Sequence, residues 1–432
     1  MMNKERIMKT KLSIEGDRFL INGSLVYSEL PQSPESVHGL LMNARMIQGV
    51  FKDKAAPERF QRYGKSFSPD MNTAELASSL PQWYARGLRA ITVGFQGGGP
   101  CFTIDNATIE NNPYGSDGLS MDPGYLSRME QLIRAADEIG MVVIVSLFYG
   151  AQTRFLRDDI AVLQAVKSAA NWLRDQEFSN VILEIANEHD ILEYRRHPIL
   201  YSPEGVVTLL ETARRESGGI PVGCSGTGGY FNSQIANTSD VILIHGNDQS
   251  PQRLYNLIQK AKAIVPKRPI VINEDSQAIS RLPLAIREGV SWGYYNNMTK
   301  QEPPTYWEIT KGEDEFFSLR LAELLGIDAA LPDEKDCFYL QGLEPHMTYQ
   351  GKRWIRLASL YPEKIEYVEF YRNGKFTGRA YEDPFMLNSV GSNWLQNPFP
   401  EVIKPGEVWM ARIHLLDGRV VETTQTVQES KG

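Results

Sequence analysis

Eight short apolar runs alternate with amphipathic segments between residues 44 and 327. Most runs are continuous stretches of apolar residues, and few alternate apolar with polar positions. Continuous runs are typical of parallel strands that helices cover on both faces. Eight such units over this length predict an α/β fold of the (β/α)8, or TIM barrel, type, which takes about 250 residues. The predicted strands span residues 44–51, 89–95, 141–150, 180–188, 220–226, 240–247, 268–275 and 291–298.

Helices are predicted between these strands. The first should begin with Asn72 or Thr73 as its N-cap, be kinked or interrupted by Pro81, and end at Gly87. An open doubly wound sheet is the alternative fold. It would need a Gly-rich phosphate loop after the first strand, and none is present there. The Gly-rich segment 95–100 follows the second strand, and we interpret it as a turn at the mouth of the barrel.

Two β-rich regions flank the predicted barrel. Residues 11–28 contain two alternating runs joined by Gly-containing turns, which predicts a small β-hairpin or meander. Beyond residue 327 helical periodicity stops, and short strands follow, separated by turns such as Asn373-Gly374. This pattern predicts a β-sandwich. We therefore expect a barrel domain over residues 1–327, including the hairpin, and a sandwich domain over residues 328–432.

The composition of the chain argues against some classes of binding partner. The formal charge is −8 and no basic cluster stands out, so neither nucleic acid nor an anionic membrane is expected as a partner. The three cysteines are far apart, and they form no disulfide framework or metal-binding pair. No run has the length of a membrane helix or a signal peptide. The expectation is a soluble chain, cytoplasmic as it stands and secreted or periplasmic if a leader once preceded it.

Polar residues gather where the predicted strands end, which in a barrel is where catalytic groups project. The fourth run ends in Asn187-Glu188 and the seventh in Asn273-Glu274. Two carboxylates in a cleft with aromatic rings are the equipment for hydrolysing a glycosidic bond, because one donates a proton while the other attacks or activates water. Asn187 can hold a sugar hydroxyl, and Trp292 of the last run can stack on a sugar ring.

The motifs IANEHD and VINEDS resemble the paired motifs of the clan A glycoside hydrolases, the family 5-like (β/α)8 enzymes. That resemblance implies that Glu188 is the acid/base, Glu274 the nucleophile and Trp292 the stacking aromatic of a retaining enzyme. There are departures. Gln96 stands where many members have an arginine on the second strand, and His245 stands where many have a tyrosine.

Other residues at the strand ends are candidates for binding the substrate. His245 could adjust the pKa of Glu274 or bind a sugar hydroxyl. Tyr149, Tyr294 and Gln96 complete the predicted binding set, while the charged segment 193–198 is expected to be a solvated loop. The C-terminal strands resemble the immunoglobulin-like or fibronectin-like modules that are often fused to glycosidases.

The sequence thus predicts a retaining glycoside hydrolase that acts on an oligosaccharide or polysaccharide and uses no cofactor or metal. Two alternatives stay open. One is an inactive carbohydrate-binding or scaffold barrel, and the other is a metal-dependent barrel hydrolase. The sequence leaves open the sugar, its linkage and anomeric configuration, endo or exo action, the role of the C-terminal domain and the oligomeric state.

Overall fold

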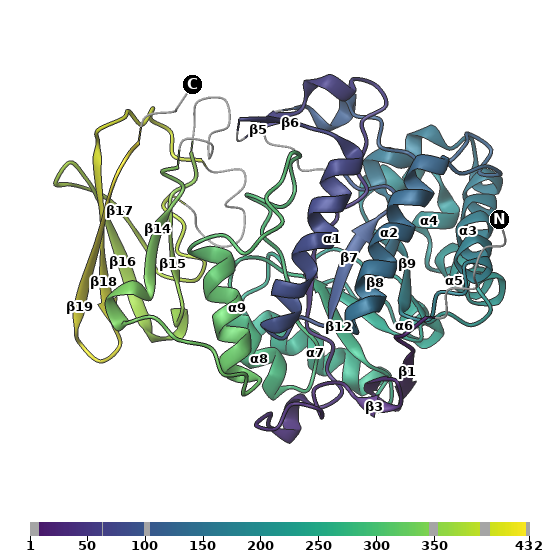
Figure 1. Cartoon of the computed structure of the whole chain (residues 1–432), viewed down its shortest axis with the longest axis horizontal. Coiled ribbons are helices and arrows are strands. Elements are labelled where there is room, and N and C mark those ends of the chain that lie inside the picture. Colours follow the sequence, from purple (N-terminus) through teal and green to yellow (C-terminus); the bar gives the residue numbers. More distant parts are fainter. Residues whose placement is uncertain (1–7, 63, 99–103, 345–352, 389–397, 429–432) are drawn as a thin grey trace.

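A computed structural model describes residues 8–62, 64–98, 104–344, 353–388 and 398–428. Figure 1 shows helices packed around a set of strands that include β7, β8, β9 and β12, with the β-rich C-terminal region at one end. Cys101 and part of the Gly-rich segment 95–100 lie outside the described residues. Cys224 and Cys337 are both buried and free. None of the helices in the described ranges has the length and apolarity to cross a membrane.

The central sheet is parallel and has six strands in the order β10-β9-β8-β7-β4-β13. A separate parallel pair joins β11 to β12. These strands correspond to the eight predicted runs, although several are shorter. Their bounds are β4 Asn43–Arg45, β7 Ala90–Gly94, β8 Val142–Tyr149, β9 Val181–Asn187, β10 Val222–Gly223, β11 Ile242–His245, β12 Ile270–Glu274 and β13 Gly293–Tyr294.

Backbone hydrogen bonds connect the β11-β12 pair to both ends of the six-stranded sheet. On one side, the Val241 amide donates to the Val222 carbonyl at 3.2 Å. On the other, Ser291 donates to Ile270 at 3.1 Å and accepts from Ile272 at 2.9 Å. All eight strands are therefore linked by hydrogen bonds in chain order.

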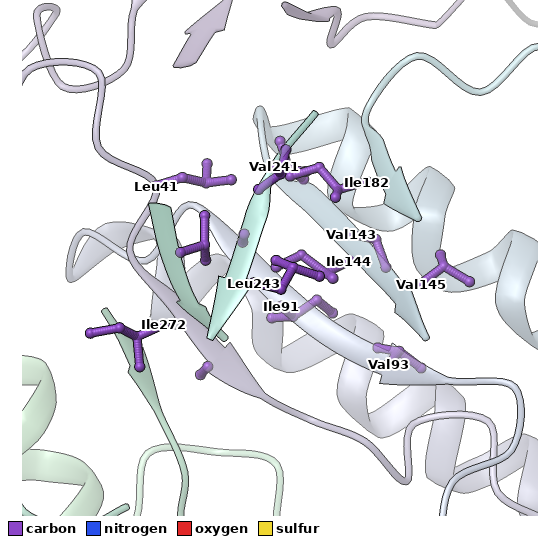
Figure 2. Packing of buried hydrophobic residues seen from close by; sticks show 14 of the residues in the cluster. Leu41, Ile91, Val93, Val143, Ile144, Val145, Ile182, Val241, Leu243 and Ile272 are labelled. Atoms are coloured by element: carbon purple, nitrogen blue, oxygen red, sulfur yellow. The ribbon is translucent and has the colours of Figure 1, made fainter. Parts of the chain in front are cut away.

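The core of this region is built from branched side chains on the strands. Figure 2 shows them filling the space among the strand ribbons. Each is at most 3% exposed, and full burial of one such side chain is worth about 1.5–3 kcal/mol. The side chains labelled there are Leu41, Ile91, Val93, Val143, Ile144, Val145, Ile182, Val241, Leu243 and Ile272.

Helices follow most of the strands, as the alternation predicts. Five of the longer ones have a Ser or Asp N-cap whose side chain accepts a backbone N–H, and each of these five but α3 has Pro in its first turn. The sequence analysis did not predict the short helices α4 and α6. The bounds are α1 Pro69–Ala85, α2 Pro123–Ile139, α3 Asp159–Asp175, α4 Pro198–Tyr201, α5 Pro203–Glu216, α6 Ser233–Thr238, α7 Pro251–Ile264, α8 Arg281–Arg287 and α9 Glu313–Leu324.

The predicted start of α1 is wrong. Ser68 is the N-cap, so the helix begins at Pro69, three residues before Asn72. Asn72 and Thr73 instead turn inward, where they donate to the carbonyls of Gln48 and Gly49. Pro81 does not interrupt the helix, which continues to Ala85.

The predicted first strand is too long. β4 ends at Arg45, and the following residues to Phe51 leave the sheet. Arg45 therefore occupies the C-terminal end of this strand. This shift matters for the site, because it brings a cation to the edge where the carboxylates gather.

The N-terminal β-region agrees with its prediction. Strands β1 Leu12–Glu15, β2 Arg18–Ile21 and β3 Ser24–Leu25 form a small antiparallel sheet. A two-stranded hairpin, β5 Gln61–Arg62 with β6 Lys65–Ser66, is an addition that the sequence did not indicate. The 3₁₀ segments are Glu35–Val37, Pro57–Arg59, Asn106–Thr108, Gly150–Phe155, Leu192–Arg196, Glu334–Asp336 and Pro362–Lys364.

The C-terminal region is antiparallel. One sheet has the order β17-β16-β18-β19 and a second pairs β14 with β15. Asn373 and Gly374 both have positive φ and make the predicted turn between β16 and β17. A separate apolar cluster that includes Phe370, Trp409 and Leu357 fills this region. The strands are β14 Phe338–Gln341, β15 Arg356–Ser359, β16 Ile365–Arg372, β17 Lys375–Ala380, β18 Val408–Leu415 and β19 Val420–Thr426.

A buried ion pair joins the two regions. Arg356 of β15 lies 3.0 Å from Glu313 of α9, and both side chains are almost fully buried. Burial raises the pKa of Glu313 to about 7 despite this partner. The contact fixes the C-terminal sheets against the last helix of the α/β region.

Candidate active site

Four side chains from separate strands meet at the C-terminal edge of the parallel strands. Arg45 ends β4, Glu188 follows β9, His245 ends β11 and Glu274 ends β12. One ligand atom each of Glu188, His245 and Glu274 lies within 4.8 Å of the other two. The structure thus brings the two predicted carboxylates together, although 86 residues separate them in the sequence. The cluster is called the carboxylate site below.

Glu274 is held by two donors. Arg45 Nε lies 3.0 Å from its Oε2, and Asn247 Nδ2 donates to its Oε1 at 2.9 Å. The residue is only 6% exposed. The ion pair with Arg45 and the hydrogen bond from Asn247 favour the ionised carboxylate, while burial opposes it.

Glu188 is more accessible, with 21% of its side chain exposed. Its backbone has φ +54°, a left-handed conformation that non-glycine residues seldom adopt and that costs on the order of 1–2 kcal/mol. The Ser225 hydroxyl accepts the Glu188 amide proton at 3.2 Å and supports this turn. The turn aims the carboxylate at His245, whose Nδ1 lies 3.1 Å from Oε1.

Arg45 is the main residue of the site that the sequence analysis missed. Besides its contact with Glu274, it donates from its NH2 nitrogen to Asn187 Oδ1 at 2.9 Å. Its guanidinium also lies 5.3 Å from the ring centre of Tyr295, within the range of a cation–π contact. The available signal was an arginine inside an apolar run, a position where charge is expensive unless it is paired.

A third carboxylate lies four residues before Glu188 in the sequence. Glu184 of β9 is fully buried. It accepts from Ser225 Oγ at 2.6 Å and from Asn273 Nδ2 at 2.9 Å. Ser225 contacts the Glu188 backbone and Asn273 precedes Glu274, so Glu184 ties the supports of both carboxylates together.

His245 faces two carboxylates. Its Nδ1 lies 3.1 Å from Glu188 and 3.7 Å from Glu274. Burial works against the charged ring, but the charge of Glu274 and the hydrogen bond to Glu188 outweigh it and raise the pKa of His245. In the same way, burial acts to raise the pKa of Glu188, but His245 outweighs it and lowers that pKa.

The pKa of Glu274 is raised. Burial is the largest cause, while Arg45 and His245 act in the opposite direction. The site therefore sets three carboxylates, at residues 184, 188 and 274, against one arginine and one histidine. Glu188, His245 and Glu274 lie close enough for their titrations to be coupled, with protons shared among them. The raised pKa of His245 favours the protonated imidazole.

Trp292 and Tyr294 are both buried, so neither ring is exposed for the predicted contact with a sugar. Trp292 is fully buried, donates to Asp275 Oδ2 at 2.8 Å and packs 5.8 Å from the ring of Phe317 in α9. Tyr294 stacks on the same Phe317 at 4.1 Å, and its hydroxyl donates to Asp314. Because residues two apart on a strand share a face, both rings serve the packing against α9. Tyr295, on the opposite face, is the aromatic beside Arg45.

Gln96 also differs from its predicted role as a sugar ligand. Its Nε2 donates to Asn112 at 2.7 Å and its Oε1 accepts the Tyr149 amide at 3.2 Å. With both ends of the amide used, Gln96 positions the end of β8 instead. Tyr149 remains partly exposed at that strand end, opposite Asn187 in the strand register.

The charged residues of the segment 193–198 are exposed, as expected, but two of its other side chains are buried. Tyr194 is fully buried, and its hydroxyl lies 2.9 Å from the carbonyls of both Phe148 and Asn187. His197 is buried as well and lies 2.9 Å from the Thr153 carbonyl. The segment thus braces the ends of β8 and β9 from outside, directly behind the carboxylate site.

The donor set of Glu188, His245 and Glu274 is one that can hold a metal ion. Carboxylate oxygen and imidazole nitrogen suit several divalent ions. However, Arg45 already places a fixed positive charge 3.0 Å from Glu274. A cation at these atoms would be repelled by the guanidinium, so the arrangement fits proton chemistry better than metal chemistry.

Comparisons with known proteins find solved structures with a similar fold. No protein-family model and no curated protein matches the chain. Among solved structures, a Bacteroides vulgatus protein provisionally described as a glycoside hydrolase is similar with a TM-score of 0.51 and 10% identity, over 98% of this chain and 82% of that one. This chain shares that protein's fold.

Two further solved structures are similar at lower scores. One is described as a glycoside hydrolase, with a TM-score of 0.47, 14% identity, and coverage of 98% of this chain and 94% of that one. The other is a calcium-binding mutant of Bacteroides uniformis β-glucuronidase 2, with a TM-score of 0.48, 8% identity, and coverage of 97% and 47%. Both TM-scores lie below 0.5.

Proposed function

We propose that this protein is a glycoside hydrolase with Glu188 and Glu274 as its catalytic carboxylates. The observation that carries the proposal is the approach of the two groups, which place carboxylate oxygens within 4.8 Å of one another at the C-terminal strand edge. Retaining enzymes hold their carboxyl groups about 5–5.5 Å apart, whereas inverting enzymes need about 6.5–9.5 Å for a water. The short separation supports a retaining double displacement.

In the first step, a carboxylate oxygen of Glu274 attacks the anomeric carbon and the bond to the leaving oxygen breaks. Glu188 gives its proton to that oxygen. In the second step, Glu188 takes a proton from water, whose oxygen attacks the anomeric carbon and releases Glu274. Arg45 and Asn247 stabilise the carboxylate of Glu274 before and after the covalent intermediate.

We propose that His245 allows Glu188 to act as the acid and Glu274 as the nucleophile despite the directions of their pKa shifts. The lowered pKa of Glu188 and the raised pKa of Glu274 run opposite to the order that an acid and a nucleophile require. The shared proton on His245 lies one hydrogen bond, 3.1 Å, from Glu188. Transfer along this bond protonates Glu188 for catalysis, while Arg45 acts against burial and lowers the pKa of Glu274.

Asn187 fits a role in holding the sugar. Its Oδ1 accepts from Arg45, which fixes the direction of the amide. Across the described residues, no hydrogen bond uses its Nδ2 donor. That donor is placed beside Glu188 and can bind a hydroxyl of the sugar being cleaved.

The finer classification is also part of the proposal. Hydrogen bonds between all eight parallel strands support a closed (β/α)8 barrel, and the paired Asn-Glu motifs support a family 5-like enzyme of clan A. We place the barrel domain at residues 1–327 and an immunoglobulin-like or fibronectin-like sandwich at residues 328–432. The two antiparallel sheets and their own apolar cluster support the second assignment.

The proposal is tested with chromogenic glycosides of neutral hexoses and with oligosaccharides. E274Q should abolish hydrolysis of every substrate. E188Q should lose about 10²–10⁴-fold on natural sugars, which need general acid catalysis, and much less on a 2,4-dinitrophenyl glycoside, whose leaving group needs no proton. E211Q, an exposed change on α5, serves as the control.

Two results would redirect the proposal. A folded wild-type protein that binds oligosaccharides without cleaving any would favour the scaffold alternative. Activity that disappears with EDTA and returns with a divalent metal would favour the metal-dependent alternative at Glu188, His245 and Glu274.

A further inference from the structure

A cavity of about 260 Å³ lies beside the carboxylate site. Its walls from the α/β region come from segments that follow β11, β12 and β13, so it opens at the same edge as Glu274. Asn247 connects the cavity to the carboxylate site, because it lines the cavity and donates to Glu274 Oε1 at 2.9 Å. Asp275 and Ser276, the next residues after Glu274, line the cavity too.

The C-terminal region supplies the rest of the wall. Glu382, Asp383 and Pro384 line the cavity between the two regions. Asp383 Oδ2 accepts the backbone N–H of Ser280 at 3.0 Å, which fixes this wall against the segment before α8. Because this contact joins two parts of the chain 103 residues apart, the cavity exists only when the C-terminal region is docked.

The chemistry of the lining suits a neutral sugar. Amide, hydroxyl and carboxylate groups line it, and these are the partners that hydrogen-bond sugar hydroxyls. Among its charged residues four are carboxylates, Asp248, Asp275, Glu382 and Asp383, against the two arginines Arg253 and Arg281. Arg281 is committed to an ion pair with Asp275. An anionic sugar such as a uronic acid would meet net repulsion here.

We propose that this cavity is a binding subsite for one neutral sugar unit next to the unit that is cleaved, and that the C-terminal region completes it. Its volume of about 260 Å³ lies just below the range of about 300–1,000 Å³ for small-molecule sites, which suits one ring. The inference rests on the proposed glycosidase function and makes it more specific: the substrate is an oligosaccharide of neutral sugars.

The first test compares E382Q with wild type on a 4-nitrophenyl monosaccharide and on the matching neutral trisaccharide. Glu382 is exposed, so the isosteric change should leave the fold intact. Loss of a hydrogen bond to a charged group should lower kcat/KM for the trisaccharide about tenfold or more, and for the monosaccharide at most about twofold. D248N, which keeps a residue type tolerant of positive φ, should act in the same direction.

E366Q makes the same chemical change at an exposed position of β16 that does not line the cavity, and it should alter neither substrate. Equal effects of E382Q on both substrates, or no effect, would overturn the subsite while leaving the glycosidase proposal intact.

A second measurement does not depend on hydrolysis. E274Q is titrated with neutral trisaccharides and with glucuronic acid trisaccharides, and binding is followed by NMR. The neutral sugars should bind, and the added E382Q change should weaken them about tenfold or more. Absence of neutral-sugar binding, or preference for the glucuronic acid oligomer, would overturn the subsite. Loss of hydrolysis alone would overturn only the catalytic proposal.

Discussion

Replacing Arg45 by methionine tests the electrostatics of the carboxylate site most sharply. The change keeps an unbranched apolar stem but removes the cation 3.0 Å from Glu274 and the donor to Asn187. Two unit charges at about 4 Å attract by about 4 kcal/mol at an effective dielectric constant of about 20. Since one pKa unit corresponds to about 1.4 kcal/mol, the pKa of Glu274 should rise by about 1–3 units in R45M.

The assay is the pH profile of kcat/KM. Its acidic limb reports the ionisation of the nucleophile, so in R45M it should move to higher pH by the same amount. R45K keeps a charge but loses the forked geometry that reaches both Glu274 and Asn187, and it should shift the limb less. R412M, which removes an exposed ion pair with Glu422, is the control and should leave the profile unchanged.

The pH dependence of the stability of R45M is an independent test of this contact, and the direction of the change can be predicted. With Arg45 removed, the pKa of Glu274 is higher in the folded state than in the unfolded chain, so the folded state binds this proton more tightly. The free energy of unfolding therefore falls as the pH rises above the pKa that Glu274 has in the unfolded chain. R45M should therefore lose about 3–5 kcal/mol at neutral pH and less in acid, where Glu274 is protonated. A pH profile of R45M that superimposes on that of wild type would refute the assigned contact between Arg45 and Glu274.

Three further outcomes are expected. E184Q keeps the size of the side chain but removes a charge that raises the pKa of Glu274, so the acidic limb of kcat/KM should move to lower pH; an unchanged limb would contradict this. R356M should destabilise the protein by about 3–5 kcal/mol at pH 8, and by less below pH 7 where Glu313 is protonated, in chemical denaturation with R412M as control. H245F should flatten the pH dependence of kcat/KM near the raised pKa of His245, and a retained ionisation there would exclude His245 as the proton holder.

The strands that end in the candidate carboxylates could be predicted from the sequence because their signal is local. A buried strand such as β9 is a continuous apolar run, and polar residues directly after it must lie at the strand end. Parallel pairing then brings Glu188 and Glu274 to one edge, whatever the loops between them do. The paired Asn-Glu motifs added the chemical roles, which the apolar pattern alone does not contain.

The residues that the sequence misplaced depend on register and on tertiary packing. Trp292 and Tyr295 both lie near β13, and a shift of one residue decides which aromatic faces Arg45 and which faces α9. Arg45 was overlooked because β4 ends earlier than its apolar run suggests. Tyr194 was overlooked because its charged neighbours mask a ring that becomes buried only when β8 and β9 are in place.

Glu184 shows a different limit. A glutamate inside an apolar strand interrupts the apolar pattern. Nothing in the neighbouring sequence indicates that Ser225 and Asn273, from other parts of the chain, donate hydrogen bonds to it. The inter-regional cavity is beyond sequence reasoning for the same reason, since Glu382 and Asn247 share a wall only through the docking of the C-terminal region.

The most direct test of the central claim is the anomeric configuration of the first product, followed by proton NMR during hydrolysis of a substrate that the enzyme cleaves. Double displacement through Glu274 predicts that the newly formed product has the same anomeric configuration as the substrate, before mutarotation sets in. Formation of the opposite anomer would contradict the account, because it would require a water between Glu188 and Glu274 where the structure holds their oxygens within 4.8 Å.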